Sequence, residues 1–140
     1  MSNYPESMAM PMRQDLTEAG FVELKTPSAV DAVFEQETGT TLLVVNSVCG
    51  CAASNARPGV KMALSHSEKQ PTNLVTVFAG MEPDAVNQAR SYMLPYPPSS
   101  PAIALFKNGS LVHILERHNI EGRPAQMIAD NLADAFNEYC

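Results

Sequence analysis

The chain has 140 residues, a length that suits one folded domain with an ordinary hydrophobic core. Hydrophobic residues make up 45% of the sequence and charged residues 17%, which is typical of a globular protein and not of a disordered one. The formal net charge is -6, so the chain offers no basic field to attract the phosphates of nucleic acid or of an anionic membrane surface.

The first half of the chain alternates helical and strand patterns. A short helix is predicted over Met12 to Ala19, and the apolar residues of Phe21 to Leu24 favour a short strand. Thr26 is typical of an N-cap, and the proline after it begins a predicted helix over Pro27 to Glu37. The β-branched and apolar segment Thr40 to Asn46 then predicts a buried central strand.

The middle of the chain continues this alternation. A helix is predicted over Ala52 to His66, in which Pro58 marks a kink or a restart. A second strong strand is predicted over Asn73 to Ala79, and a helix over Pro83 to Met93. Leu94 to Pro101 follows as a loop rich in proline.

The C-terminal part predicts a hairpin and a helix. Asn108-Gly109 is the strongest turn signal, and it joins predicted strands over Ala102 to Phe106 and Ser110 to Leu115. The last helix is predicted over Pro124 to Glu138. Strand–helix–strand units imply parallel pairs, and the hairpin adds antiparallel ones. The expected fold is therefore α/β, with a mixed central β-sheet flanked by helices on both faces.

The N-terminus and the apolar runs indicate no targeting segment. MSNYPESMAMPMRQ is interrupted by two prolines and a glutamate and has no apolar signal core. Apolar runs such as Leu42 to Val45 are far too short to cross a bilayer. Three cysteines are too few for a secreted disulfide framework. We therefore expect a soluble cytoplasmic protein with a single domain over residues 1–140, of which residues 1–20 form a candidate N-terminal helical extension.

Two cysteines, Cys49 and Cys51, flank one glycine between the central strand and the following helix. In this topology the loop lies at the carboxyl edge of the sheet, where catalytic sites concentrate. Unpaired N–H groups and the helix dipole at this point favour thiolate over thiol. We predict that Cys49, at the loop apex, is the nucleophile and that Cys51, which enters the helix and is more shielded, is the resolving thiol. Arg57 would either add positive potential or pair with a carboxylate.

Gly50 separates the two cysteines. A disulfide across one residue closes a very small ring, which requires a permissive backbone, and glycine is the most permissive residue. We expect a strained bridge, and hence a couple that is less reducing than a relaxed pair with a two-residue spacer. A valine at this position is expected to impair formation of the bridge.

Other uses of the cysteine pair remain open. A metal site needs about four ligands, which would have to converge from distant parts of the chain. The available side chains are Cys140, His66, His113 and His118, and none has ligand spacing relative to the pair. We therefore expect no metal, and we keep a metal or iron–sulfur delivery module and a redox-inert binding domain as alternative hypotheses.

The order of these elements resembles the thioredoxin fold. PAIALFKNG, from Pro101 to Gly109, resembles the thioredoxin segment in which a cis-proline opens a strand that ends in a Phe-Lys-Asn-Gly turn. By that resemblance the Ser100–Pro101 bond is cis and lies beside the cysteine pair, where it shapes a substrate groove. The string VVNSVCGCAASNARPGV, together with MPMRQDLTEAGF near the start, is similar to the bacilliredoxin family, and the similarity covers almost the whole chain.

The resemblance implies a thiol–disulfide oxidoreductase that removes bacillithiol, a low-molecular-weight thiol, from mixed disulfides on client proteins. Cys49 would attack the mixed disulfide and take the bacillithiol, and Cys51 would then release it. Protein disulfide isomerase activity is an alternative. The resemblance implies no bound cofactor, bacillithiol as co-substrate, and client proteins and a low-molecular-weight thiol as partners.

The further candidates lie around the cysteine loop. The predicted substrate-binding residues are Gly50, Ser100, Pro101, Asn46 and Asn55. Loop capping is an alternative role for the two asparagines. Met8, Met10 and Met12 make the N-terminal stretch soft and apolar, and it would either cover the sheet or mediate a homodimer.

Overall fold

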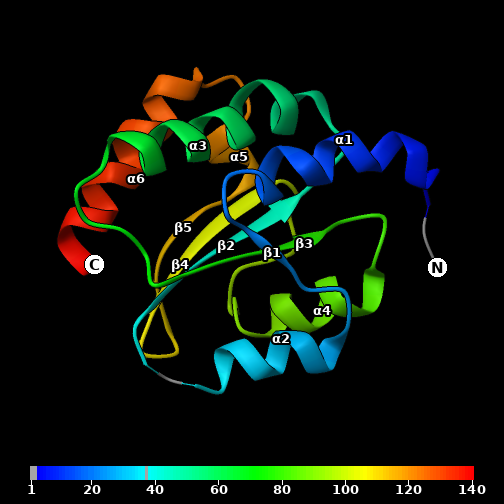
Figure 1. Ribbon diagram of the computed structural model, residues 1–140, viewed down its shortest axis with the longest axis horizontal. Helices are drawn as coiled ribbons and strands as arrows, with labels where there is room; N and C mark the ends of the chain where they lie inside the picture. Colours follow the sequence, from blue (N-terminus) through cyan, green and yellow to red (C-terminus); the bar gives the residue numbers. More distant parts are fainter. Residues whose placement is uncertain (1–2, 37) are drawn as a thin grey trace.

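The centre of the molecule is the strand β2 (Thr40–Asn46), all seven residues of which are buried. In the computed structural model, which describes residues 3–36 and 38–140, β2 pairs in parallel with β3 (Asn73–Phe78) and antiparallel with β4 (Ala102–Lys107). The edges are β1 (Val22–Glu23) and β5 (Ser110–Leu115), and the strand order is β1-β3-β2-β4-β5. The predicted mixed sheet is confirmed (Figure 1).

Helices cover both faces of this sheet. α1 (Glu6–Thr17), α3 (Arg57–His66) and α6 (Ala125–Tyr139) lie on one face, and α2 (Pro27–Phe34) and α4 (Pro83–Ser91) lie on the other (Figure 1). The predicted α/β class with helices on both faces is therefore confirmed. Within residues 3–36 and 38–140, no helix is both long enough and apolar enough to span a membrane.

Alternate residues of β2 contribute to two separate cores. Leu42 and Val44 pack in the core under α1, α3 and α6, whereas Leu43 and Val45 pack in the core under α2 and α4. Each buried side chain of this kind stabilises the fold by about 1.5–3 kcal/mol relative to an exposed one. Because both faces of the strand are buried, its position is strongly determined, and so is the point after Asn46 where the cysteine loop begins.

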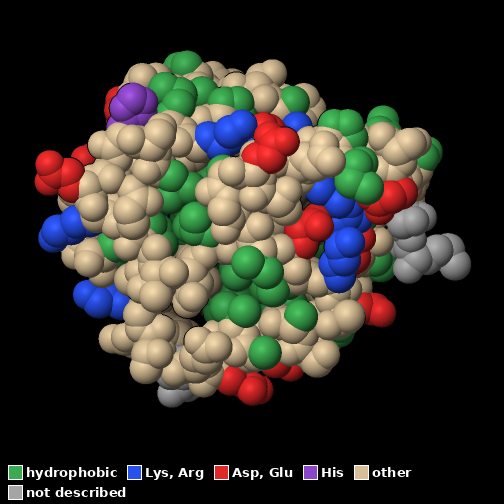
Figure 2. All heavy atoms as spheres, viewed as in Figure 1, with side chains coloured by type: hydrophobic (Ala, Val, Ile, Leu, Met, Phe, Trp, Pro, Cys, Tyr) green, Lys and Arg blue, Asp and Glu red, His purple; other side chains and the backbone are tan. Residues whose placement is uncertain are grey.

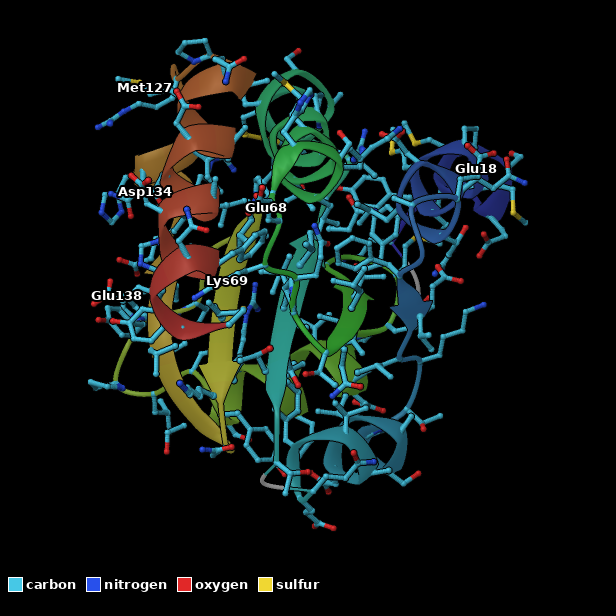
Figure 3. The ribbon with its side chains drawn as sticks, turned by 60° about the vertical axis from the view of Figure 1, so that its left-hand side comes forward. Glu18, Glu68, Lys69, Met127, Asp134 and Glu138 are labelled. Atoms are coloured by element: carbon cyan, nitrogen blue, oxygen red, sulfur yellow. A yellow bond between two sulfur atoms is a disulfide. The ribbon has the colours of Figure 1, made fainter. Side chains whose placement is uncertain are left out.

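The two helices α3 and α6 approach each other closely. A Cβ atom at Gly59 would lie 2.7 Å from Ile128 Cγ2 and 3.1 Å from the Ala125 carbonyl oxygen, so only glycine permits this contact. The outward side of α6 carries the side chains of Met127, Asp134 and Glu138 (Figure 3).

Local sequence signals were reliable at turns and caps. Thr26 Oγ1 accepts a hydrogen bond from the Ala29 N–H at 3.2 Å, with Pro27 at the first helical position. Asn108 and Gly109 have φ values of 52° and 83°, the left-handed conformations that a two-residue hairpin turn needs. Both predictions are confirmed.

Several helix boundaries differ from the predictions. α1 begins at Glu6 and contains Pro11, because the proline removes only the hydrogen bond to the carbonyl of Ser7, a solvent-exposed residue. α2 ends at Phe34, and the predicted last residue, Glu37, lies outside the described residues.

The helix predicted over Ala52 to His66 consists of two parts. A π-helix, η1 (Ala52–Ala56), precedes α3, so Pro58 marks a restart and not a simple kink. α5 (Arg117–Ile120) was not predicted from the sequence, because a single turn is too short to show helical periodicity.

Arg13 holds α1 against the rest of the molecule. It is 4% exposed, and its guanidinium pairs with Glu6 at 2.9 Å, Glu23 at 2.9 Å and Glu82 at 2.6 Å. The hydrogen bond to Glu82 is the main cause of the raised pKa of Arg13, although burial opposes it. Figure 2 shows that several basic side chains on the face in view lie directly beside acidic ones.

Tyr92 and Asp31 hold α4 and α2 together. The Tyr92 hydroxyl donates to Asp31 Oδ1 at 2.6 Å, and its ring stacks on Phe34 with centroids 4.7 Å apart. The hydrogen bond to Asp31 raises the pKa of Tyr92 to about 12.

The folded pKa of Tyr92 lies above the ordinary value of 10.0. The hydrogen bond from Tyr92 to Asp31 therefore contributes fully to the stability of the folded protein below pH 10. This contribution is lost as the pH rises through 12. We expect an ultraviolet titration to show one tyrosine ionising near pH 12, and Tyr92→Phe to lack that step. Ionisation of every wild-type tyrosine near its ordinary value would contradict this expectation.

Candidate active site

The cysteine loop connects β2 to a helical run that begins at Gly50 and continues through η1 and α3. Cys49 and Cys51 form a disulfide, with their Cα atoms 5.5 Å apart. Both cysteines are half-buried and Gly50 is exposed, so solvent reaches the loop.

Cys49 is the last residue before the helical run. Its carbonyl oxygen accepts hydrogen bonds from the N–H groups of Ala52 and Ala53 at 3.0 and 3.3 Å. The cysteine pair thus lies at the N-terminal, positive end of the run, where amide dipoles favour a thiolate. Since both cysteines are half-buried, exposure does not single out Cys51 as the more shielded sulfur, and their roles as nucleophile and resolving thiol stay a prediction.

The conformation of Gly50 changes one expectation. Its φ is not in the left-handed region, and it has a helical conformation that any residue can adopt. A Cβ atom built on it would meet no atom within 4 Å outside the two neighbouring residues. We therefore expect residues other than glycine to close the ring as well.

Two substitutions at Gly50 test this expectation. We expect Gly50→Ala and Gly50→Val to form the disulfide as the wild type does. Gly50→Val should slow reaction with a protein mixed disulfide about tenfold, or about 1.4 kcal/mol in the barrier, because its side chain obstructs a bulky substrate. Reaction with a small disulfide such as oxidised 2-mercaptoethanol serves as the control. Failure of Gly50→Ala to form the bridge would contradict the expectation.

Asn46 lies beneath the loop and is 1% exposed. Its side-chain amide donates to the Met12 carbonyl of α1 at 3.1 Å, and Oδ1 accepts from the Ser47 N–H at 2.9 Å and from Arg57 Nη1 at 2.8 Å. These contacts match the loop-capping alternative. A direct contact between Asn46 and a substrate would require them to break.

Arg57 is also buried next to the loop. Its Nη1 donates to the Ser47 carbonyl at 3.0 Å, and its Nε donates to Asp15 Oδ2 at 3.1 Å. Ser47 Oγ in turn accepts from the Cys49 N–H at 3.1 Å. Arg57 thus pairs with a carboxylate, which is one of the two roles that the sequence allowed for it. Asp15 was not predicted as a site residue, because no local sequence pattern indicates that α1 reaches this site.

Pro101 lies at the same edge of the sheet as the cysteine loop. It is buried and directly precedes β4, whose first residue, Ala102, pairs with Val45 near the end of β2. The Ser100–Pro101 bond is cis, as the resemblance implied. Ser100 is half-buried, and its carbonyl accepts from Arg117 Nη1 at 3.3 Å.

Asn55 lies on η1 and is half-buried. Its side-chain amide donates to the carbonyl of Arg123, in the turn that precedes α6. This bond ties the helical run of the cysteines to the C-terminal part of the chain, which again matches a capping role. Substrate binding by Asn55 stays a prediction.

The cysteine pair does not belong to a larger group of metal-binding side chains. Among the described residues, no group of three or more His, Cys, Asp or Glu side chains could hold a metal ion. Cys140 packs against the core at the end of α6. The reactive groups that the structure describes at the site are the two bonded sulfur atoms.

Solved structures share this fold. A thioredoxin pre-protein of Schistosoma mansoni aligns with a TM-score of 0.58 and 16% identity, over 86% of this chain and 98% of its own. A thioredoxin of Fasciola hepatica aligns with a TM-score of 0.57 and 15% identity, over 84% and 98%. These structures define the fold of this chain, which is the thioredoxin fold, and the half-buried Cys49–Cys51 pair follows its central strand β2.

Sequence relatives give the family. The family model described as Disulphide isomerase matches residues 4–140. A bacilliredoxin of Cytophaga hutchinsonii is 59% identical over 96% of this chain and 98% of its own. A bacilliredoxin of Halalkalibacterium halodurans is 50% identical over 99% and 95%. This chain belongs to the bacilliredoxin family.

Proposed function

We propose that this protein removes bacillithiol from mixed disulfides on client proteins, with Cys49 as nucleophile and Cys51 as resolving thiol. The observation that carries the proposal is an accessible Cys49–Cys51 bridge at a helix N-terminus, in a chain 59% identical to a bacilliredoxin. The name of the relatives refers to bacillithiol, which gives the proposal its specific substrate.

The reaction has two exchanges. The Cys49 thiolate attacks the bacillithiol sulfur of the mixed disulfide, and the client cysteine leaves as a thiolate and takes up a proton. The Cys51 thiolate then attacks the Cys49 sulfur, which releases bacillithiol and leaves the Cys49–Cys51 disulfide. The client disulfide is thereby reduced and the protein is oxidised. Two further thiols of low molecular weight return the protein to its reduced form and become a disulfide themselves.

The surroundings of the site support this sequence of steps. Amide dipoles at the helix start favour the thiolate of Cys49, as both nucleophile and leaving group. Gly50 is exposed and carries no side chain, which leaves room for a client at the tip of the loop. In this proposal Ser100 and Pro101 border the substrate, whereas Asn46 and Asn55 position the loop through the hydrogen bonds described above. We place the reaction in the cytoplasm, and self-association into a homodimer stays a prediction.

The test compares two modified forms of one client protein. One form carries bacillithiol and the other carries glutathione on the same cysteine, and each is mixed with the reduced protein. We expect mass spectrometry to show faster loss of bacillithiol than of glutathione. Equal rates would remove the proposed specificity and leave a general thiol–disulfide oxidoreductase.

Disulfide isomerase activity is the second candidate, because the matching family model is described as Disulphide isomerase. A client with scrambled internal disulfides separates the two functions. Recovery of the native pairing at a rate that exceeds bacillithiol removal would favour isomerase activity as the main function.

A further inference from the structure

Arg57 places a permanent positive charge beneath the loop that carries the cysteines. It lies at the junction of η1 and α3, is 4% exposed, and reaches back toward the end of β2. Its Nη1 donates both to Asn46 Oδ1 and to the Ser47 carbonyl, at 2.8 and 3.0 Å. Ser47 is bonded to the Cys49 backbone N–H, so a single residue links the guanidinium to Cys49.

A carboxylate from another helix faces the same guanidinium. Asp15 of α1 accepts from Arg57 Nε at 3.1 Å and from Lys61 Nζ at 2.6 Å. Burial raises the pKa of Asp15, but the hydrogen bonds and charges of Lys61 and Arg57 outweigh it, so the pKa lies below its ordinary value. Asp15 is therefore ionised at neutral pH and offsets part of the positive charge.

Other charged groups lie around the same part of the molecule. Glu18 of α1 lines the same surface hollow as Asp15 and Arg57, whose volume is about 230 Å³. Arg117 contacts Ser100, which precedes the buried Pro101, and pairs with Glu121 at 3.2 Å. Among these groups, Arg57 is the buried one.

We infer that Arg57 is a positioning residue for the redox reaction: it holds the turn before Cys49 and stabilises the sulfur anion, and Asp15 weakens that stabilisation. The inference rests on the proposed function, because it takes Cys49 as the attacking thiol. Beyond that function, it gives α1 an influence on the reactivity of Cys49, because α1 contributes both Asp15 and the Met12 carbonyl that is bonded to Asn46.

Two substitutions distinguish a role of Arg57 through its charge from a role in packing alone. If Arg57 acts through its charge, Arg57→Gln should raise the pKa of Cys49, because an opposite charge nearby favours the thiolate. Asp15→Asn should lower that pKa, since it removes a negative charge and keeps the shape of the side chain. If the pair only supports the fold, both substitutions loosen the same contact and should shift the pKa in the same direction.

The experiment measures the rate of Cys49 alkylation by iodoacetamide against pH, in the full chain carrying Cys51→Ala so that only Cys49 remains in the loop. We expect Arg57→Gln to raise the apparent pKa by about one unit, and Asp15→Asn to lower it by about half a unit. Arg57→Lys should recover part of the effect, because it keeps the charge but not the two-fold contact of Nη1. Lys107→Gln, an exposed residue at the far end of β4, is the control for loss of one charge and should have no effect.

Several outcomes would overturn the inference. An unchanged pKa in Arg57→Gln would do so, as would shifts of the same sign in Arg57→Gln and Asp15→Asn. If Arg57→Gln does not fold, an unchanged or raised pKa in the isosteric Asp15→Asn variant would be decisive on its own. A parent pKa near the ordinary thiol value of about 8.5 would contradict thiolate activation and overturn the proposed function together with the inference. If the pKa of Cys49 in the Cys51→Ala chain is low but the second substitutions do not shift it as expected, only the inference is overturned.

Discussion

Replacement of Cys49 by alanine is expected to abolish bacillithiol removal, whereas replacement of Cys51 is expected to preserve the first attack. The reason is the position of Cys49 at the start of the helical run, where the amide dipoles lie. Cys51→Ala lacks the internal resolving thiol, so its turnover should depend on the concentration of added thiol. Stopped-flow release of client thiol, measured in single and multiple turnover, separates these two steps.

The control for this comparison is Cys140→Ser, since Cys140 lies at the C-terminal end of α6 and is not part of the disulfide. It should turn over as the wild type does. If Cys51→Ala were inert and Cys49→Ala still released client thiol in a single turnover, the two roles would be reversed.

Arg13→Ala is expected to give the largest loss of stability. It would leave Glu6, Glu23 and Glu82 without the buried guanidinium that they share, and it would remove the contact with the Phe78 ring, whose centroid lies 5.2 Å from Arg13 Cζ. Breaking a buried ion pair by removing one partner costs about 3–5 kcal/mol, and the partial exposure of these carboxylates places the loss near the lower figure. Urea unfolding measures it directly.

The matched control for Arg13→Ala is Lys25→Ala. Lys25 also pairs with Glu23, at 3.8 Å, but its side chain is 56% exposed. An exposed pair of this kind contributes about 0–1 kcal/mol, so the control should unfold almost as the wild type does. A loss below about 1 kcal/mol in Arg13→Ala would mean that solvent replaces the guanidinium readily.

The strands and turns could be predicted from the sequence because their signals are local or periodic. Thr40 to Asn46 and Ser110 to Leu115 have the predicted boundaries, since the first is a run of β-branched and apolar residues and the second follows an Asn-Gly turn. The start of α1 was predicted too late, because Pro11 reads as a helix breaker although only one solvent-facing hydrogen bond is lost.

The cysteines of the candidate site were also predictable, because a Cys-Gly-Cys motif between a strand and a helix is typical of a pair of redox-active thiols. The groups that surround it were not. Asp15, Asn46 and Arg57 are separated by at least 11 positions in sequence and meet only because α1 lies across the end of β2. No spacing rule brings such residues together, and the pairing of Arg57 became clear only from the packing of the helices.

The central claim is that the Cys49 sulfur takes bacillithiol from the client. The most direct measurement is mass spectrometry with peptide mapping of the Cys51→Ala variant, after incubation with a bacillithiolated client. We expect an unmodified client and one bacillithiol on Cys49. A client that keeps its bacillithiol, together with an unmodified Cys49, would contradict the claim.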